Sequence, residues 1–260
     1  MARVTAQPMP SNYYGGTTVV PPGSGLDQLA SLDEIFIQQR KEWLEIFTSW
    51  ESNNKYVLRN SMGQQCFYAF EEATCCQRQW CRGAREFQLH IVDNNGNELL
   101  RLFRPFICQP CGTCCDMGQQ QLFVEGPPGI AIGSIQQQTF CCSPKFKIYD
   151  HNNFSRFEIF GKCWQCDCSD RNFLVGNFED GQIMATITKQ WAGCLTETWT
   201  DADKYVIRCK SIKLMYFFLF VLFHLSFIND VVPINLDVRL KALLLGCLFL
   251  IDFMFFEFEK

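Results

Sequence analysis

Short apolar runs alternate with polar turns over the middle of the chain. Pairs of runs flank turns rich in Asn, Asp and Gly, which is the residue chemistry of β-hairpins. Four such pairs are Tyr56–Leu58 with Cys66–Tyr68, Phe87–Ile91 with Leu99–Leu102, Phe146–Tyr149 with Phe157–Ile159, and Phe173–Val175 with Ile183–Ile187. No helical periodicity separates these pairs, so the pattern predicts one antiparallel β-barrel or sandwich that extends to about residue 200.

A helical pattern precedes the first hairpin. Ser31–Glu34 has the sequence of a capping box, and Ile35, Phe36, Trp43, Leu44 and Phe47 recur at helical spacing. We therefore predict an amphipathic helix from about Leu32 to Phe47. The residues before it, Met1–Gly25, are rich in Pro, Gly, Ser and Thr, and we expect a disordered tail there.

The last apolar run has two interpretations. From Ala242 to Phe256 only Asp252 interrupts it, and a bilayer-spanning helix needs about 20 apolar residues. The helix at 238–256 is thus either the core around which a domain closes or a membrane anchor. Its apolar positions and the carboxylate between them are Leu243, Leu244, Leu245, Phe249, Leu250, Ile251, Asp252 and Phe253. In both cases Asp252 needs a partner, because a lone carboxylate in apolar surroundings is costly.

Composition narrows the classes of function. The 260 residues are 48% hydrophobic with a net charge of −4, so bulk electrostatics do not favour a nucleic-acid partner. The sixteen cysteines stand out, and the N-terminus has no apolar segment typical of a signal peptide. We therefore expect reduced thiols, metal ligands or acylation sites inside the cell. Neither a phosphate-binding loop nor a catalytic constellation around the three histidines is evident, which argues against an enzyme.

Many short motifs, in order, resemble the phospholipid scramblase family. They are Pro21–Gly23, Asn53–Tyr56, Asn60–Gln64, Cys75–Cys76, Arg104–Pro105, Pro127–Gly129, Ile132–Gly133, Pro144–Phe146, Trp191–Gly193, Thr200–Asp203, Leu236–Arg239 and Leu250–Glu257. The resemblance implies a tubby-like fold, in which a β-barrel encloses the C-terminal apolar helix. We accordingly expect a mainly β domain over 26–257, including the N-terminal amphipathic helix.

The family also implies palmitoylation of a cysteine cluster. Here the cluster is Cys108, Cys111, Cys114 and Cys115, with Gly112 and Thr113 where the family has further thiols. Acylation requires accessible thiols near a membrane and no strict geometry, whereas zinc pairs usually lie about 15–20 residues apart. Metal binding, with Cys163 and Cys166 as a second pair, and inert buried thiols remain the alternatives.

A calcium site is likewise implied by the resemblance. The positions that match the family's proposed loop are Asp201, Asp203, Tyr205, Ile207, Asn235 and Asp237. Alternating oxygen-bearing side chains suit Ca²⁺, which takes six to eight oxygen ligands. Val206 replaces the usual Gly and Asn235 replaces a carboxylate, so we expect weak affinity. A polar loop before the last helix is the alternative.

Residues Arg208–Asp230 have no counterpart in the family pattern. Their apolar part, Leu214–Ile228, lies between the two halves of the calcium segment. It could be a membrane-inserting helix, a helix that packs on the last one, or the product of an unspliced intron. We favour the last of these, as an atypical apolar insertion.

The sequence therefore predicts a phospholipid scramblase, which moves phospholipids in both directions between membrane leaflets, without ATP and in response to Ca²⁺. Membrane phospholipids are the expected partners, together with further copies of the chain and with proteins that bind the N-terminal tail. The expected location is the cytoplasmic face of the plasma membrane, through palmitate and a possible single pass of the C-terminal helix. The alternative is a palmitoylated adaptor that binds lipid at the membrane surface and transports nothing.

Overall fold

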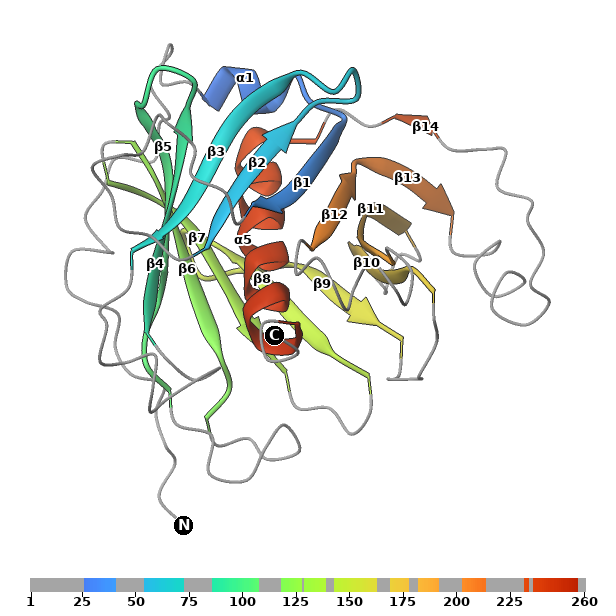
Figure 1. Cartoon of the computed structure of the whole chain (residues 1–260). Coiled ribbons are helices and arrows are strands. Elements are labelled where there is room, and N and C mark those ends of the chain that lie inside the picture. Colours follow the sequence, from blue (N-terminus) through green and yellow to red (C-terminus); the bar gives the residue numbers. More distant parts are fainter. Residues whose placement is uncertain are drawn as a thin grey trace.

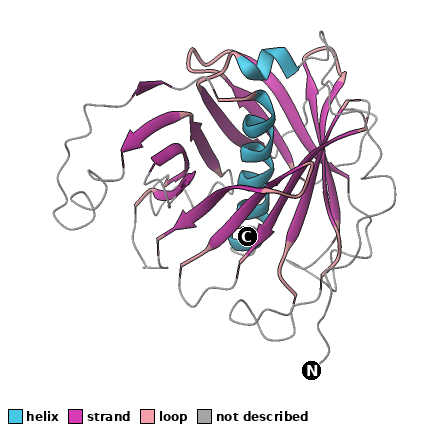
Figure 2. Ribbon diagram, turned by 180° about the vertical axis from the view of Figure 1, so that it is seen from behind, coloured by secondary structure: helices cyan, strands magenta, loops and turns pink. Residues whose placement is uncertain are grey.

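A computed structural model describes residues 26–40, 54–72, 86–107, 118–127, 129–138, 143–162, 169–177, 182–191, 203–213, 232–233 and 236–256. Within these ranges the fold is mainly β, with one long helix at its centre (Figure 1). Seen from behind, strands again surround this helix (Figure 2). The predicted barrel around a C-terminal helix is confirmed.

Twelve of the described strands form the barrel, and all neighbouring pairs are antiparallel. The order around it is β10-β9-β8-β7-β6-β5-β4-β3-β2-β1-β12-β11, and pairing between β10 and β11 closes the ring. Closure leaves no long exposed strand edge. The strands are β1 Glu34–Arg40, β2 Lys55–Arg59, β3 Gln65–Glu72, β4 Phe87–Asp93, β5 Glu98–Arg104, β6 Gln121–Gly126, β7 Ile130–Gln137, β8 Lys145–Asp150, β9 Ser155–Gly161, β10 Arg171–Asn177, β11 Gln182–Gln190 and β12 Lys204–Arg208.

All four predicted hairpins are present, as β2–β3, β4–β5, β8–β9 and β10–β11. Local chemistry explains them. In the β4–β5 turn, for example, Asp93 Oδ1 accepts the backbone N–H groups of Asn95 and Asn97, and Gly96 adopts a positive φ. Such turns need no distant contact to form. The hairpin β6–β7 and the strands β1 and β12 were not predicted.

The helix α5, Val238–Phe255, is the core of the barrel. All eight positions proposed above for a core or membrane helix are buried to 4% exposure or less. Close packing explains Gly246, where an added Cβ would come within 2.8 Å of a Val124 methyl carbon. Because barrel side chains enclose these positions, α5 is the core helix of the two interpretations, and a pass of this helix through a bilayer is not supported.

None of the helices in the described part of the chain combines the length and the apolarity that a bilayer crossing requires.

The N-terminal helix is shorter and lies earlier than predicted. The helix α1 is Leu26–Ala30, whereas Glu34–Arg40 form strand β1, so the prediction of a helix from Leu32 is wrong over this segment. The side chains of β1 alternate strictly, with Ile35, Ile37 and Gln39 buried. Pairing with both β2 and β12 satisfies the backbone of β1, and this pairing outweighs the local helical spacing. The remainder of the predicted helix lies outside the described residues.

The start of the predicted insertion belongs to the barrel wall. Arg208 is the last residue of β12, and its guanidinium lies 3.3 Å from Glu34. Cys209 follows, fully buried, and its N–H donates to the Asp33 carbonyl. Lys210–Lys213 form β13, which pairs with β11, and Val232–Pro233 form β14, which pairs with β13. The apolar stretch Leu214–Ile228 lies outside the described residues.

Candidate functional site

The two ends of the barrel differ in the length of their connections. At the end where α5 begins, the strands are joined by three to five residues. At the end where α5 finishes, the six connections contain from 7 to 16 residues. Long connections on a rigid scaffold are where functional residues concentrate, so this end is the first candidate for a functional surface.

Aromatic and cationic side chains of the barrel wall contact the C-terminal end of α5. The ring of Phe253 stacks on that of Phe87 at the start of β4, with centroids 4.1 Å apart. Lys189, near the end of β11, places its Nζ 3.8 Å from the ring centroid of Phe256. The Arg171 guanidinium lies 5.6 Å from the same centroid. Two cations thus lie at the C-terminal end of α5, where the helix dipole favours positive charge.

Most of the cysteines belong to these long connections. They are Cys75, Cys76, Cys81, Cys108, Cys111, Cys114, Cys115, Cys141, Cys142, Cys163, Cys166, Cys168 and Cys194. All of them, including the four proposed for palmitoylation, lie outside the described residues. What the described strands establish is that five separate cysteine-bearing connections begin and end at one end of the barrel.

A buried polar cluster holds the base of the connection that carries Cys108–Cys115. Arg104, the last residue of β5, is 1% exposed, and its Nε and Nη2 donate to Gln120 Oε1 at 2.9 and 2.6 Å. Gln120 Nε2 donates in turn to the Ile107 carbonyl, and the Gln120 N–H donates to Gln137 Oε1. This cluster fixes both ends of the connection relative to β5 and β7.

The three cysteines within the described ranges are poor nucleophiles. Burial raises the pKa of the Cys209 thiol to about 11, and it raises the pKa of Cys247 well above its ordinary value. Burial also raises the pKa of Cys66, against an opposing hydrogen bond from Asn60. Since the thiolate is the reactive form, these three residues serve packing.

Asp252 has two tyrosine partners inside the barrel. Tyr56 Oη donates to Oδ2 and Tyr205 Oη donates to Oδ1, both at 2.6 Å, and all three residues are 1% exposed. The prediction that Asp252 has a partner within the barrel is confirmed. The identity of the partners was missed, because they lie 196 and 47 residues away along the chain.

The residues proposed for Ca²⁺ do not all converge. Tyr205 and Ile207 are buried in the barrel, with the Tyr205 hydroxyl on Asp252. Asp203 lies 3.1 Å from Lys189 Nζ, at the end where α5 finishes. Asp237 is the N-cap of α5, at the other end.

The length of α5 separates the two carboxylates. At about 1.5 Å per residue, its 18 residues extend roughly 27 Å, so Asp203 and Asp237 cannot bind one ion together. Asp201 and Asn235 lie outside the described residues. Among the described ranges no three His, Cys, Asp or Glu side chains are grouped to hold a metal ion. The described members of the proposed set therefore do not fit a single Ca²⁺ site.

Comparison with known proteins agrees with the fold. The chain matches the family model "Scramblase" over residues 15–258. Phospholipid scramblase 1 of Homo sapiens is 37% identical over 238 residues, which are 91% of this chain and 66% of that protein. Phospholipid scramblase 2 of Bos taurus is 35% identical over 241 residues, covering 92% and 73% of the two chains. Phospholipid scramblase family member 5 of Homo sapiens is 34% identical over 251 residues, covering 96% and 82%.

A twelve-stranded barrel closed around its C-terminal helix, with this match over nearly its whole length, defines the class of protein. The chain belongs to the scramblase family. It spans 63–66% of the length of the three phospholipid scramblase 1 relatives that it matches. No solved structure matches the chain.

Proposed function

We propose that this protein is a phospholipid scramblase, which moves phospholipids in both directions between the leaflets of a membrane without ATP. The observation that carries this proposal is the scramblase family match over residues 15–258, with relatives named phospholipid scramblases. The function is lipid transport rather than catalysis.

The barrel end with the long connections faces the membrane in this proposal. Five cysteine-bearing connections start there, and thioester acylation of Cys108, Cys111, Cys114 or Cys115 would attach that end to the bilayer. One acyl chain gives only marginal attachment, so at least two are required. The helix α5 takes no part in the attachment, because barrel side chains enclose it.

The lipid path lies outside the barrel. Fourteen residues of α5 are buried, so the helix fills the interior between the described strands and leaves no route for a polar headgroup between them. A headgroup must avoid the hydrocarbon region, since transfer of a charged or polar group into it is costly. The path therefore follows the outer wall, either between copies of the chain or beside a locally disturbed bilayer. Further proteins would bind through the N-terminal tail.

Ca²⁺ dependence is part of the proposal, although the described members of the predicted set do not form a single Ca²⁺ site. Asp203 and Asp237 lie at opposite ends of α5, so Ca²⁺ would use one of them and not both. Asp203 is the better candidate, because it lies at the end that faces the membrane. Its pairing with Lys189 at 3.1 Å opposes binding of a cation and favours weak affinity.

Dithionite quenching of labelled lipid in proteoliposomes tests the function. The full chain and a variant with Ser at the four clustered cysteines are each reconstituted, with and without Ca²⁺. If the full chain scrambles lipid, dithionite will quench a larger fraction of the labelled lipid than the fraction in the outer leaflet. If only the outer leaflet is quenched under all conditions while the protein stays bound, the protein is an adaptor and the proposal fails. Loss of binding in the Ser variant would support attachment through these thiols.

A further inference from the structure

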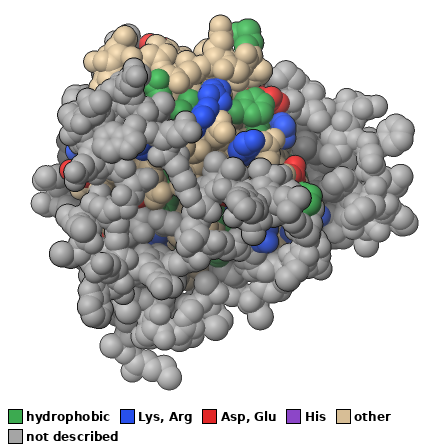
Figure 3. Space-filling model, viewed as in Figure 1, with side chains coloured by type: hydrophobic (Ala, Val, Ile, Leu, Met, Phe, Trp, Pro, Cys, Tyr) green, Lys and Arg blue, Asp and Glu red, His purple; other side chains and the backbone are tan. Residues whose placement is uncertain are grey.

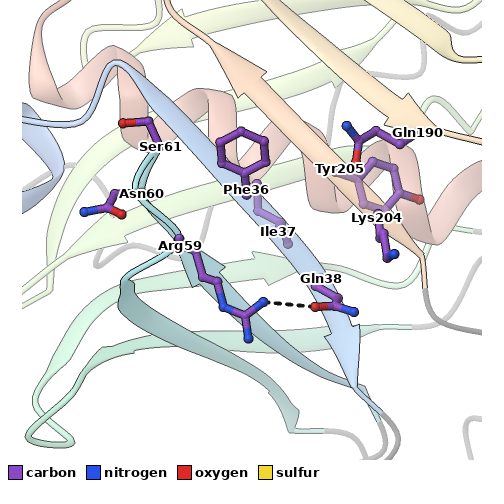
Figure 4. Close-up of a pocket in the computed structure, with 10 residues that line it drawn as sticks. Phe36, Ile37, Gln38, Arg59, Asn60, Ser61, Gln190, Lys204 and Tyr205 are labelled. Atoms are coloured by element: carbon purple, nitrogen blue, oxygen red, sulfur yellow. Dashed lines mark hydrogen bonds between the residues drawn. The ribbon is translucent and has the colours of Figure 1, made fainter.

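A groove of about 350 Å³ runs over the outer wall of the barrel across β12, β1 and β2 (Figure 4). Its volume lies within the range of small-molecule sites. It extends from the Asn60–Ser61 turn, at the end with tight connections, to Gln190 and Lys204, at the end with long ones. The groove thus lies along the outer wall, where the filled interior requires a lipid path to be.

Two cations approach the same point of the groove. Lys204 on β12 pairs directly with Gln38 on β1. Arg59 on β2 is opposite Phe36, but its guanidinium extends along the strand and donates to Gln38 Oε1 at 3.1 Å. Both positive side chains therefore flank Gln38, with Gln190 beside Lys204 on the next strand. The hydrogen bond from Arg59 to Gln38 restrains the guanidinium before any ligand binds, which reduces the entropic cost of binding.

The charged side chains among the described residues of the groove are both positive. No Asp or Glu is among the described residues that line it, although the whole chain has a net charge of −4. The carboxylates nearest along the same strands have cations of their own. Glu34 lies 3.3 Å from Arg208, and Asp203 lies 3.1 Å from Lys189. Figure 3 shows several separate Lys and Arg side chains on the described surface of this face, with Asp and Glu side chains near them.

We propose that this groove binds the phosphate group of an anionic ligand, through Arg59 and Lys204, with Phe36 against the apolar part next to the phosphate. A guanidinium presents a planar set of donors that fits two phosphate oxygens, and an ammonium adds a point charge. The phosphate can belong to a membrane phospholipid or to a small soluble phosphate ester. The lipid case rests on the proposed scramblase function, and there the groove is a headgroup site outside the barrel.

Binding by the full chain is measured with two kinds of probe. Soluble probes are inorganic phosphate and glycerol 3-phosphate, followed by titration calorimetry. Membrane probes are phosphatidylcholine vesicles with and without phosphatidic acid, followed by co-sedimentation. The test variant combines Arg59→Gln with Lys204→Gln. The matched control combines Arg156→Gln with Lys147→Gln, which removes the same two charge types from the outer face of β8 and β9.

Each lost charge-assisted contact should weaken binding about tenfold, so the test variant should lose roughly a hundredfold and the control little. Binding to vesicles that contain phosphatidic acid, without binding to the soluble probes, identifies a membrane headgroup as the ligand. Binding to the soluble probes identifies a small phosphate ester. The proposal is overturned if the wild type binds neither soluble probe and binds vesicles with phosphatidic acid no better than vesicles of phosphatidylcholine alone, or if the control loses as much as the test variant. Lys204→Gln alone, at an exposed position, repeats the test if the double variant unfolds.

The dithionite assay on the same proteins separates the two proposals. If the wild type scrambles lipid and the test variant keeps full phosphate binding, the groove proposal is wrong and the scramblase function stands. If the wild type does not scramble lipid, while the test variant alone loses phosphate binding, the scramblase function is wrong and the groove stands.

Discussion

The hydrogen bonds of Asp252 with Tyr56 on β2 and Tyr205 on β12 connect α5 to the barrel wall and should contribute strongly to stability. All three side chains are buried, and burial, followed by the nearby Asp252 charge, raises the pKa of Tyr205 well above its ordinary value. Tyr205 is therefore a neutral hydroxyl donor at neutral pH. The perturbation is to remove the donors and then the acceptor in turn.

The magnitudes follow from the charge and burial of the cluster. A hydrogen bond to a charged group contributes about 1.5–3 kcal/mol, so Tyr56→Phe and Tyr205→Phe should each lower the unfolding free energy by that amount. The double variant leaves a buried carboxylate without either tyrosine and should lose about 3–5 kcal/mol. Adding Asp252→Val removes the carboxylate itself at similar volume. The triple variant should then regain most of the loss, because no buried charge remains.

Urea unfolding followed by far-UV circular dichroism measures each free energy, with an unchanged slope as evidence of comparable states. The control is Tyr149→Phe, at a partly exposed position of β8, which should change stability by less than about 0.5 kcal/mol. A triple variant at least as unstable as the double variant would contradict this expectation. The loss would then come from packing and not from the removal of the two tyrosine donors of Asp252.

Variants at three further positions test packing, a buried cation and a turn. Gly246→Val should lower the unfolding free energy by about 1–3 kcal/mol in urea, and Gly246→Ala by less, because β6 and β7 side chains leave no space at this position of α5. Lys241→Met should cost about 1–3 kcal/mol and speed hydrogen exchange in α1, since Lys241 Nζ donates to two carbonyls of the α1–β1 segment. Equal exchange in both proteins would contradict that role. Burial raises the pKa of Asp150, but the hydrogen bonds from its turn and from Arg156 together have the larger effect, so the pKa is lowered. A lowered pKa stabilises the fold above the unfolded-state value of about 3.9, and the gain disappears as pH falls through the folded-state value. The stability difference between wild type and Asp150→Asn should therefore be full at neutral pH and vanish in acid, and a difference independent of pH would contradict this.

Contacts between segments distant in sequence determine two features of the fold that the local sequence pattern did not predict. The segment Glu34–Arg40 has helical spacing, yet it is a strand because β2 and β12 pair with its two edges. Both partners follow β1 in sequence, and β12 begins about 170 residues after the start of β1. The same holds for Arg208, which local reasoning assigned to an insertion and which pairs in β12 with Glu34 and Thr186.

Local sequence was enough to predict the hairpins and the apolar C-terminal helix, because turn chemistry and apolar runs act over a few neighbouring residues. It also indicated that Asp252 needs a partner, since the cost of burying a carboxylate is independent of the fold. The position of α5 in the core could be seen in the folded barrel alone, because it depends on which side chains surround the apolar run. Only the closed barrel places Asp203 and Asp237 at opposite ends of α5, and brings Arg59 and Lys204 to the two sides of Gln38.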